Sequence, residues 1–356
     1  MSRSPESYPT SAFDYELPAG SIARFPAVER DRSRLLVLDR NSGRLRHRIF
    51  HDILEYIAPG DALVLNETRV FPARLLGRKP SGARVEVLLL RPHGGDAASA
   101  FDWEAIVRPG AKLKPGRFVH VGEDLDIEIL ETTGRGGRIV RLHTTGNPTE
   151  TIARYGILPL PPYMEREADD TDRERYQTVY ARSTGSVAAP TAGLHFTSGL
   201  LDELEARGVR IVRLVLHVGP GTFRPVTAED PAEHQLHSEP YTLSEPAARA
   251  INETKTKGDK VWAVGTTVVR TLETLVGPDG RVRSGSGETA LFIRPPYRFR
   301  VVDRLITNFH LPRSTLLMLV SAFGGHEAVM NAYREAVREG YRFYSYGDAM
   351  AIVEED

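Results

Sequence analysis

The sequence contains no cysteine. Structural disulfides, thiolate nucleophiles, cysteine zinc sites and ordinary cysteine-ligated iron–sulfur clusters are therefore excluded. No uninterrupted apolar run approaches the ~18 residues that a membrane span needs. The first ten residues also lack the apolar segment of a secretory signal. We therefore expect a cytoplasmic protein that has no membrane association.

Three common catalytic signatures are missing as well. No G-x-x-x-x-G-K-[ST] sequence is present, so P-loop nucleotide hydrolysis is not indicated. No G-x-G-x-x-G follows a strand-like segment, which disfavours a dehydrogenase or a common Rossmann-type methyltransferase. Without a G-x-S-x-G elbow, a hydrolase triad has no obvious nucleophile.

The chain has almost no net charge, at −1, which argues against a protein coated in positive charge. A nucleic-acid footprint can still be local. One short region carries a clear excess of arginine, at positions Arg24, Arg30, Arg32, Arg34, Arg40, Arg44, Arg46 and Arg48. A solvated face and a phosphate-binding surface both remain open for it.

The order of apolar segments predicts an α/β protein with a small antiparallel β-barrel inserted in it. Strands are expected at 35–38 and 62–65, then short strands with Gly or Pro breaks at 84–90, 101–107, 117–121, 125–130 and 138–143. We assign residues 1–72 and 150–356 to a discontinuous α/β domain and 73–149 to the barrel. The barrel's Lys112, Lys114, Arg117, Phe101 and Trp103 could contact nucleic acid, or serve as surface lysines and core aromatics.

Alternating helices and strands return after the barrel. Helices are expected at 150–155, 244–257, 267–276, 314–323 and 326–339, and strands at 261–264, 290–293 and 341–346. A further helix should begin at Ser198 as its N-cap and end before Gly208. It leads into a buried strand that ends at His217.

Two loops flank this helix and strand, and they share an unusual composition. The segment from Ser186 to Thr197 and the segment His217-Val-Gly-Pro-Gly-Thr-Phe223 both combine proline, glycine, threonine and histidine. Loops of this kind at the tip of a buried strand are where α/β proteins bind ligands. Each loop alone could be an ordinary turn, but together they indicate a site.

Two further segments place polar groups at strand ends. Val261-Trp-Ala-Val-Gly265 followed by Thr266 and Thr267 resembles a strand–turn–helix cradle for a phosphate or carboxylate, and Arg270 could point toward it. In Ile306-Thr-Asn-Phe-His310, Asn308 and His310 can form hydrogen bonds with the edges of a base. No histidine spacing matches a metal motif, so we expect no metal.

Taken in order, several segments resemble one enzyme family, S-adenosylmethionine:tRNA ribosyltransferase-isomerase of the queuosine pathway. The resemblance covers essentially the whole chain beyond its first residues and is loosest in the barrel. The segments that carry it are 13–18, 22–26, 30–36, 65–70, 158–163, 176–180, 187–196, 217–223, 237–239, 264–267, 307–312 and 341–350.

The resemblance implies that S-adenosylmethionine acts as a co-substrate that donates its ribosyl group. The implied acceptor is the aminomethyl group of 7-aminomethyl-7-deazaguanine at the wobble position of tRNA, and the products are epoxyqueuosine, adenine and methionine. Radical use of this co-substrate normally needs a cysteine-held cluster. We therefore expect polar chemistry, with a base at the ribose C5′–H and a hydrogen-bond donor for the departing adenine.

Chemistry suggests roles for the residues of these motifs. His195 is the first candidate for the base or acid, and His217, His237 and Glu239 are second choices. The residues expected to contact the co-substrate are Thr191, Gly193, Gly219, Gly221, Thr222, Phe223, Gly265, Thr266, Thr267 and Arg270. The residues expected to contact tRNA are Arg30, Arg32, Arg34, Arg69, Arg74, Asn308 and His310.

We expect the enzyme to be a monomer. Two other functions compete with this interpretation. A methyltransferase with the same co-substrate would release S-adenosylhomocysteine instead of adenine and methionine. A non-catalytic RNA-binding module would bind tRNA in a salt-sensitive way without turnover.

Overall fold

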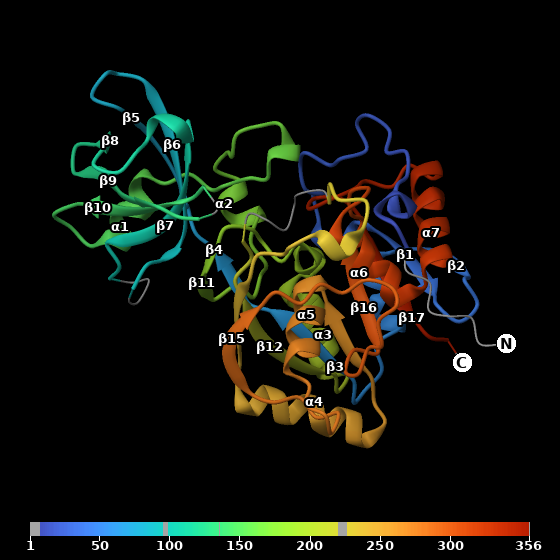
Figure 1. Ribbon diagram of the computed structural model, residues 1–356. Helices are drawn as coiled ribbons and strands as arrows, with labels where there is room; N and C mark the ends of the chain where they lie inside the picture. Colours follow the sequence, from blue (N-terminus) through green and yellow to red (C-terminus); the bar gives the residue numbers. More distant parts are fainter. Residues whose placement is uncertain (1–7, 95–98, 135, 220–225, 356) are drawn as a thin grey trace.

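A nine-stranded sheet forms the main body of the molecule (Figure 1), with the strand order β15-β13-β12-β3-β14-β16-β17-β1-β2. The structure is a computed structural model that describes residues 8–94, 99–134, 136–219 and 226–355. The strands are β1 (Arg34–Asp39), β2 (Leu45–Ile49), β3 (Ala62–Asn66), β12 (Arg210–Leu216), β13 (Glu239–Leu243), β14 (Val261–Val264), β15 (Gly285–Thr289), β16 (Arg304–Asn308) and β17 (Ala349–Val353).

The four central strands β12, β3, β14 and β16 run parallel, so their carboxyl ends meet at one edge of the sheet. Alternate residues of one strand face opposite sides, as Leu36 and Leu38 of β1 pack in one core and Leu35 and Val37 in the other. Helices α4 to α7 pack in the first core, and α3 and the short helix η3 (Phe50–Glu55) pack in the second. Both faces of the sheet are therefore covered, as a parallel sheet requires.

Five helices cover the sheet of the main body, and α3, α4 and α6 each begin after a capping Ser or Thr side chain. The five are α3 (Ser198–Ala206), α4 (Glu245–Lys257), α5 (Thr266–Leu275), α6 (Thr315–Gly324) and α7 (His326–Arg338). Ser244 caps α4, whose end is Gly258 with φ +85°. Thr197 caps α3 through its side chain, so the prediction of Ser198 as the N-cap is wrong by one residue.

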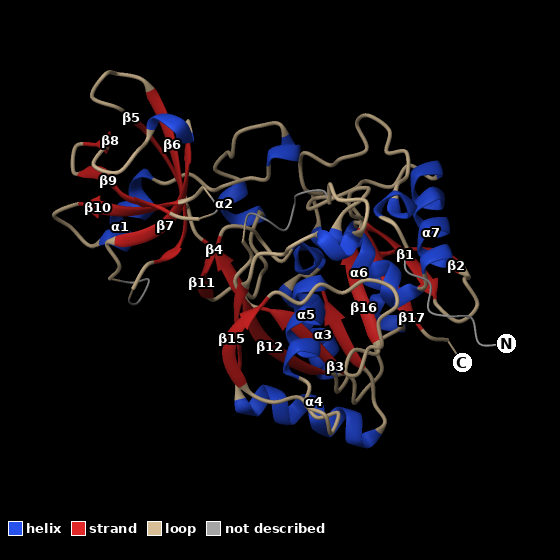
Figure 2. Cartoon of the chain, in the orientation of Figure 1, coloured by secondary structure: helices blue, strands red, loops and turns tan. Residues whose placement is uncertain are grey.

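The predicted barrel is confirmed: six antiparallel strands close in the order β10-β7-β6-β5-β8-β9 (Figure 2). They are β5 (Arg74–Arg78), β6 (Arg84–Pro92), β7 (Asp102–Arg108), β8 (Phe118–Gly122), β9 (Leu125–Thr132) and β10 (Arg138–His143). All six lie within the predicted insert 73–149, whose limits as a domain stay a prediction.

A short two-stranded parallel sheet lies where the barrel joins the main body. It pairs β4 (Thr68–Val70), just before the barrel, with β11 (Ser183–Ser186), which follows α1 (Pro148–Tyr155) and α2 (Asp172–Arg175). The barrel lies beside the main body in Figure 1 and has a core of its own.

Two strands were predicted in the wrong place. Residues 290–293 form no strand, because the edge position belongs to the polar, glycine-rich β15. Residues 341–346, all described, form no strand: Phe343 makes one isolated bridge with Ile22, and the chain then bends at Tyr344, which has φ +74°. The strand of this region is β17, an apolar run without alternation that is buried throughout.

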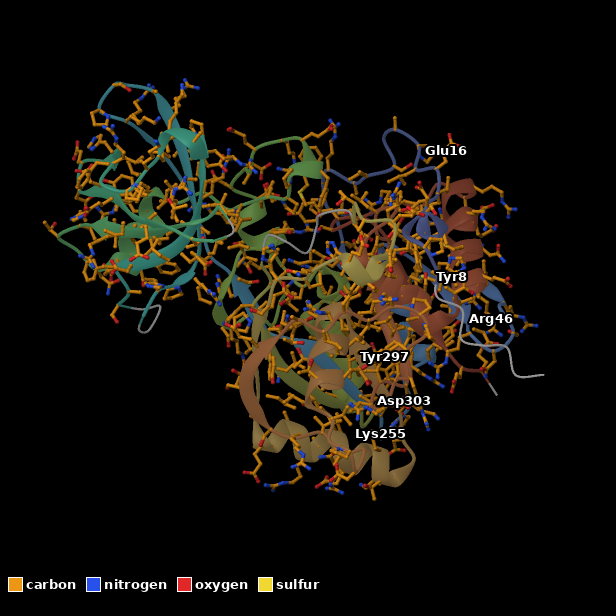
Figure 3. All side chains as sticks on the ribbon, in the orientation of Figure 1. Tyr8, Glu16, Arg46, Lys255, Tyr297 and Asp303 are labelled. Atoms are coloured by element: carbon orange, nitrogen blue, oxygen red, sulfur yellow. The ribbon has the colours of Figure 1, made fainter. Side chains whose placement is uncertain are left out.

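An ion pair connects α4 to the residue that precedes β16. Lys255 of α4 lies 2.7 Å from Asp303, and both are labelled in Figure 3. Asp303 also accepts a hydrogen bond from the amide of Val261 at the start of β14. Across the described residues, no helix is long and apolar enough to cross a membrane.

Candidate active site

A small cavity of about 40 Å³ lies at the carboxyl edge of the parallel strands. Brought together around it are residues predicted in three separate motifs: Thr191, Gly265, Thr266, Thr267, Asn308 and His310. The carboxyl edge of a parallel sheet is the usual ligand position in α/β proteins. Three motifs that lie far apart in the sequence thus meet at one cavity.

The amino end of α5 points into this cavity. Gly265 links β14 to α5 with φ +91°, a conformation that favours glycine. No side chain caps the helix, and Thr266 and Thr267 line the cavity directly. The first N–H groups of a helix and its dipole together attract anions, so this end can hold a carboxylate.

Asn66, which was not among the predicted site residues, fixes the frame of the cavity. Its side-chain nitrogen donates to the carbonyl of Leu216 (2.9 Å) and to the hydroxyl of Thr267 (3.3 Å). Its oxygen accepts from the amides of Leu216 (3.0 Å) and Thr68 (3.2 Å). One fully buried amide thereby ties the ends of β3 and β12 to α5.

His195 is enclosed, and both of its ring nitrogens have partners. Nδ1 lies 2.7 Å from Ser33 Oγ, and Nε2 lies 3.2 Å from the Asn308 side-chain nitrogen. The ring stacks on Phe50 at 5.0 Å. Burial, with lesser effects from Arg342 and Arg30, lowers the pKa of His195 to about 3. His195 is therefore neutral near pH 7.

Asn308, at the end of β16, and His310, two residues later, differ in whether their side chains have a free hydrogen-bonding group. The Asn308 amide donates to Tyr344 O (3.2 Å) and accepts from the Thr191 hydroxyl (3.1 Å), so both of its ends are engaged. His310 Nε2 lies 2.8 Å from Thr307 Oγ1, whereas its Nδ1 has no partner among the described residues. Burial lowers the pKa of His310 to about 3.

His217 is half-buried and has one engaged nitrogen. Its Nδ1 lies 2.7 Å from Thr68 Oγ1, and its Nε2 has no hydrogen-bond partner among the residues that the structure describes. The ring packs on Gly185, where a Cβ atom would come within 2.7 Å of it. Burial lowers the pKa of His217 below its usual value. The next residue, Val218, lines the cavity.

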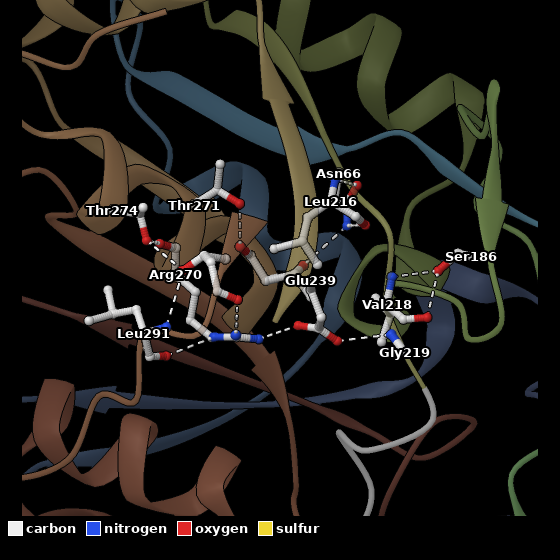
Figure 4. Close-up of polar contacts among 12 residues, drawn as sticks. Asn66, Ser186, Leu216, Val218, Gly219, Glu239, Arg270, Thr271, Thr274 and Leu291 are labelled. Carbon is white, nitrogen blue, oxygen red and sulfur yellow. Dashed lines mark hydrogen bonds and ion pairs between the residues drawn. The ribbon is translucent and has the colours of Figure 1, made fainter. Parts of the chain in front are cut away.

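Glu239 and Arg270 form a buried ion pair that holds the entry of the second loop (Figure 4). The other Glu239 oxygen accepts from the amide of Gly219 at 2.9 Å. Arg270 also donates to the carbonyls of Leu291 (3.0 Å) and Thr289 (3.2 Å). The charge of Arg270 is thus matched by Glu239, and α5 is connected to the loop.

Some of the remaining predicted residues of the two loops are described by the structure, and others are not. Gly193 has the Tyr180 hydroxyl packed where its Cβ would be. Ser186, an unpredicted residue, accepts from the Val218 amide (2.8 Å) and joins the two loops. Exposed His237 lies two residues before Glu239. Gly221, Thr222 and Phe223 lie outside the described residues.

Most of the arginines predicted to contact tRNA already have protein partners. Arg30 donates to the carbonyls of Leu194 and Glu174, both at 3.1 Å. Arg34 donates to Glu339 O (2.7 Å) and covers the Tyr341 ring at 3.7 Å. The ion pairs of the others are Arg32 with Glu29 (3.4 Å) and Arg74 with Glu86 (3.0 Å).

Arg69 differs from these four. It is exposed on β4, between barrel and main body, and has no ion pair among the described residues. Among all the residues that the structure describes, no group of three or more His, Cys, Asp or Glu side chains could hold a metal ion.

The fold and cavity define an α/β protein that can hold an anionic small molecule beside neutral histidines. Comparison with known proteins is more specific. Residues 10–352 match the model of the family described as queuosine biosynthesis protein. The chain belongs to this family.

Relatives and a solved structure agree over nearly the full length. The S-adenosylmethionine:tRNA ribosyltransferase-isomerase of Heliobacterium modesticaldum is 55% identical over 344 residues, 96% of this chain and 98% of the relative. That of Symbiobacterium thermophilum is 54% identical, over 96% and 99%. The crystal structure of the S-adenosylmethionine tRNA ribosyltransferase from Thermotoga maritima is 40% identical, covers 96% and 100%, and has a TM-score of 0.55. The chain is accordingly an enzyme, a transferase-isomerase.

Proposed function

We propose that the enzyme transfers and isomerises the ribosyl group of S-adenosylmethionine onto 7-aminomethyl-7-deazaguanine at the wobble position of tRNA. The products would be epoxyqueuosine in the tRNA, adenine and methionine. The observation that carries the proposal is the cavity in which the uncapped end of α5 faces His310 and Asn308. The relatives' names, which include S-adenosylmethionine and tRNA, support it.

The end of α5 suits the carboxylate of the methionine part. Gly265 lets the backbone approach a ligand closely, and the amides of Thr266 and Thr267 begin the helix without a cap. Arg270 was predicted to bind this carboxylate as well. Its pairing with Glu239 favours another role, in which the two buried charges position α5 and Gly219.

The proton transfers place different demands on the two loop histidines. A general base needs a nitrogen with a free lone pair, within reach of the substrate proton that it removes. His217 meets these conditions better than His195, because its Nε2 is unoccupied among the described residues and its ring is half-buried. We propose His217 as the proton acceptor, and we propose that His195 orients Asn308 through Nε2.

His310 is the better candidate for reading the modified base. Its unoccupied Nδ1 belongs to a cavity-lining residue, whereas Asn308 would have to give up Thr191 or Tyr344 first. Because burial keeps His310 neutral, its ring can present one donor and one acceptor.

A product assay tests the proposed function directly. Purified enzyme would be incubated with S-adenosylmethionine and tRNA that carries the aminomethyl-deazaguanine, and adenine, methionine and the tRNA nucleosides would be quantified by mass spectrometry. Equal release of adenine and methionine, with a ribosylated tRNA base, is the expected result. S-adenosylhomocysteine would instead identify a methyltransferase, and tRNA binding without any turnover would identify a binding module.

A further inference from the structure

The two ends of the barrel differ in charge. The strand register places the β5–β6 turn, the end of β7 and the start of β8 at the same end, because Arg78 lies opposite both Arg84 and His120, and Glu86 lies opposite Arg108. Seven cationic side chains gather there, which we call the basic end: Arg78, Lys79, Arg84, Arg108, Lys112, Lys114 and Arg117.

None of these seven side chains has an ion pair with an acidic group among the described residues, and all but Lys79 are exposed. Of the acids on the neighbouring strands, Glu86 is paired with Arg74 (3.0 Å), Glu128, opposite Phe118, lies 2.9 Å from His143, and Glu131 is exposed. Uncompensated cations repel one another, so a surface of this kind favours an anionic partner.

At the opposite end of the barrel, the cationic side chains form ion pairs with acidic side chains. These pairs are Arg141 with Asp102 (2.7 Å), Arg154 with Asp124 (2.9 Å) and Arg91 with Glu104 (2.6 Å). Acids also line the broad hollow at this end. The barrel is therefore polarised along its length, with the unpaired cations at one end only of its described part.

A groove lies beside the basic end, on the side of the barrel that faces the main body. It has a volume of about 330 Å³ and runs between the outer face of β5–β7 and the main body. Arg108 of the basic end and Glu86 line it on one side. Val187 and Ala188 line it on the other, together with residues 159–162 and 165–167, which include Glu165 and Glu167. Ala189, Pro190 and Thr191, the next residues of the chain, line the cavity at the end of α5.

We infer that the basic end binds the sugar–phosphate backbone of the RNA substrate, and that the groove admits the nucleotide to be modified. This inference rests on the proposed function for the identity of the RNA. Lysine and arginine without acidic partners bind phosphates and release counterions from the nucleic acid. Phe118, the next residue after Arg117, packs against the His143 ring at 5.6 Å and is 43% exposed, so the open part of its ring can contact an unpaired base.

The main-body arginines are poorer phosphate ligands. Arg30 and Arg34 donate to backbone carbonyls, and Arg32 is paired with Glu29. Arg69, which is exposed on β4 and has no ion pair among the described residues, can add a contact. With a net charge of −1 for the chain, RNA affinity must come from a local surface of this kind.

The test compares two triple variants that remove the same charge. K112Q/K114Q/R117Q changes the basic end, and R249Q/K257Q/R281Q changes exposed cations on and near α4. Binding of an unmodified tRNA transcript with a queuosine-type anticodon would be measured over a range of salt concentrations. Turnover would be measured with tRNA that carries the aminomethyl-deazaguanine.

The barrel triple should lower tRNA affinity by about tenfold or more and reduce the salt slope by roughly two to three. Its KM for tRNA should rise, with kcat at saturating tRNA and KM for S-adenosylmethionine unchanged. The α4 triple should behave as the wild type. Unchanged binding by the barrel triple, equal weakening in both triples, or a loss of kcat alone would each overturn the inference.

The same data separate this inference from the proposed function. If the wild type binds tRNA but does not turn over, and the barrel triple alone weakens binding, the surface stands and the proposed reaction fails. If the wild type turns over and the barrel triple binds normally, the reaction stands and the surface is wrong.

Discussion

His195 and His217 stand in two loops of similar composition, yet the fold gives their rings different surroundings. His195 is enclosed, with Ser33 and Asn308 on its two nitrogens and Phe50 against its face. His217 is half-buried and has only Thr68 as a hydrogen-bond partner of its ring among the described residues. Capacity for proton transfer depends on such partners, which a loop's composition does not reveal.

The largest expected effect comes from His217→Ala. If His217 accepts a proton in the reaction, kcat should fall on the order of 10²- to 10⁴-fold. The thermal unfolding temperature should change little, because the ring is half-buried and makes one hydrogen bond. Single-turnover kinetics and calorimetry would check this. A fall in kcat of less than about tenfold would exclude this role.

His195→Ala should act mainly through stability. It removes the stacking on Phe50 and leaves Ser33 and Asn308 without one partner each, so we expect a loss of about 2–4 kcal/mol in the free energy of unfolding. Urea unfolding would measure this loss. If the variant keeps wild-type stability but loses kcat as strongly as His217→Ala, His195 is the proton carrier instead.

Gly193→Ala tests how rigidly the first loop is held. An added methyl would overlap with the Tyr180 hydroxyl and press on Thr178, so a destabilisation of about 1–3 kcal/mol is expected. Tyr180→Phe removes the opposing oxygen and should restore part of the stability in the double variant. A double-mutant cycle of unfolding free energies would check this, and strict additivity would contradict the contact.

Near neutral pH, the smallest expected effect is in the pH dependence of stability. Burial lowers the pKa of His195 from 6.5 to about 3, so the unfolded chain binds the proton more readily within that range. The stabilising contribution is fully present above pH 6.5 and is lost as the pH falls toward 3, by up to about 1.4 kcal/mol per pH unit. His195→Gln should flatten this slope by about one proton. An unchanged slope would mean that His195 keeps an ordinary pKa.

Sequence reasoning recovered what periodicity and turn residues encode locally. The α/β class, the closed barrel, and the position of Gly265 between β14 and α5 all follow from local signals. Asn66 also had a signal, since it directly follows an apolar strand. The polar, glycine-rich β15 carries no strand signal, and its pairing with β13 decides its conformation.

Contacts between distant residues could not be predicted in this way. Ser33 meets His195 across 162 positions, and Asn66 meets Leu216 across 150. The arginine excess near the amino end was visible, but the partners that occupy Arg30 and Arg34 were not. Whether a charged side chain is available to a ligand depends on its tertiary partners, and only the folded structure shows these partners.

The pair formed by Glu239 and Arg270 has an evolutionary consequence. Each charge is buried, and removing one partner of a buried pair costs roughly 3–5 kcal/mol because the other charge is left uncompensated. A lineage that changes one position alone would lose much of its fold stability and the anchor of Gly219. Across the family, positions 239 and 270 should therefore be inherited as a unit and exchanged only together.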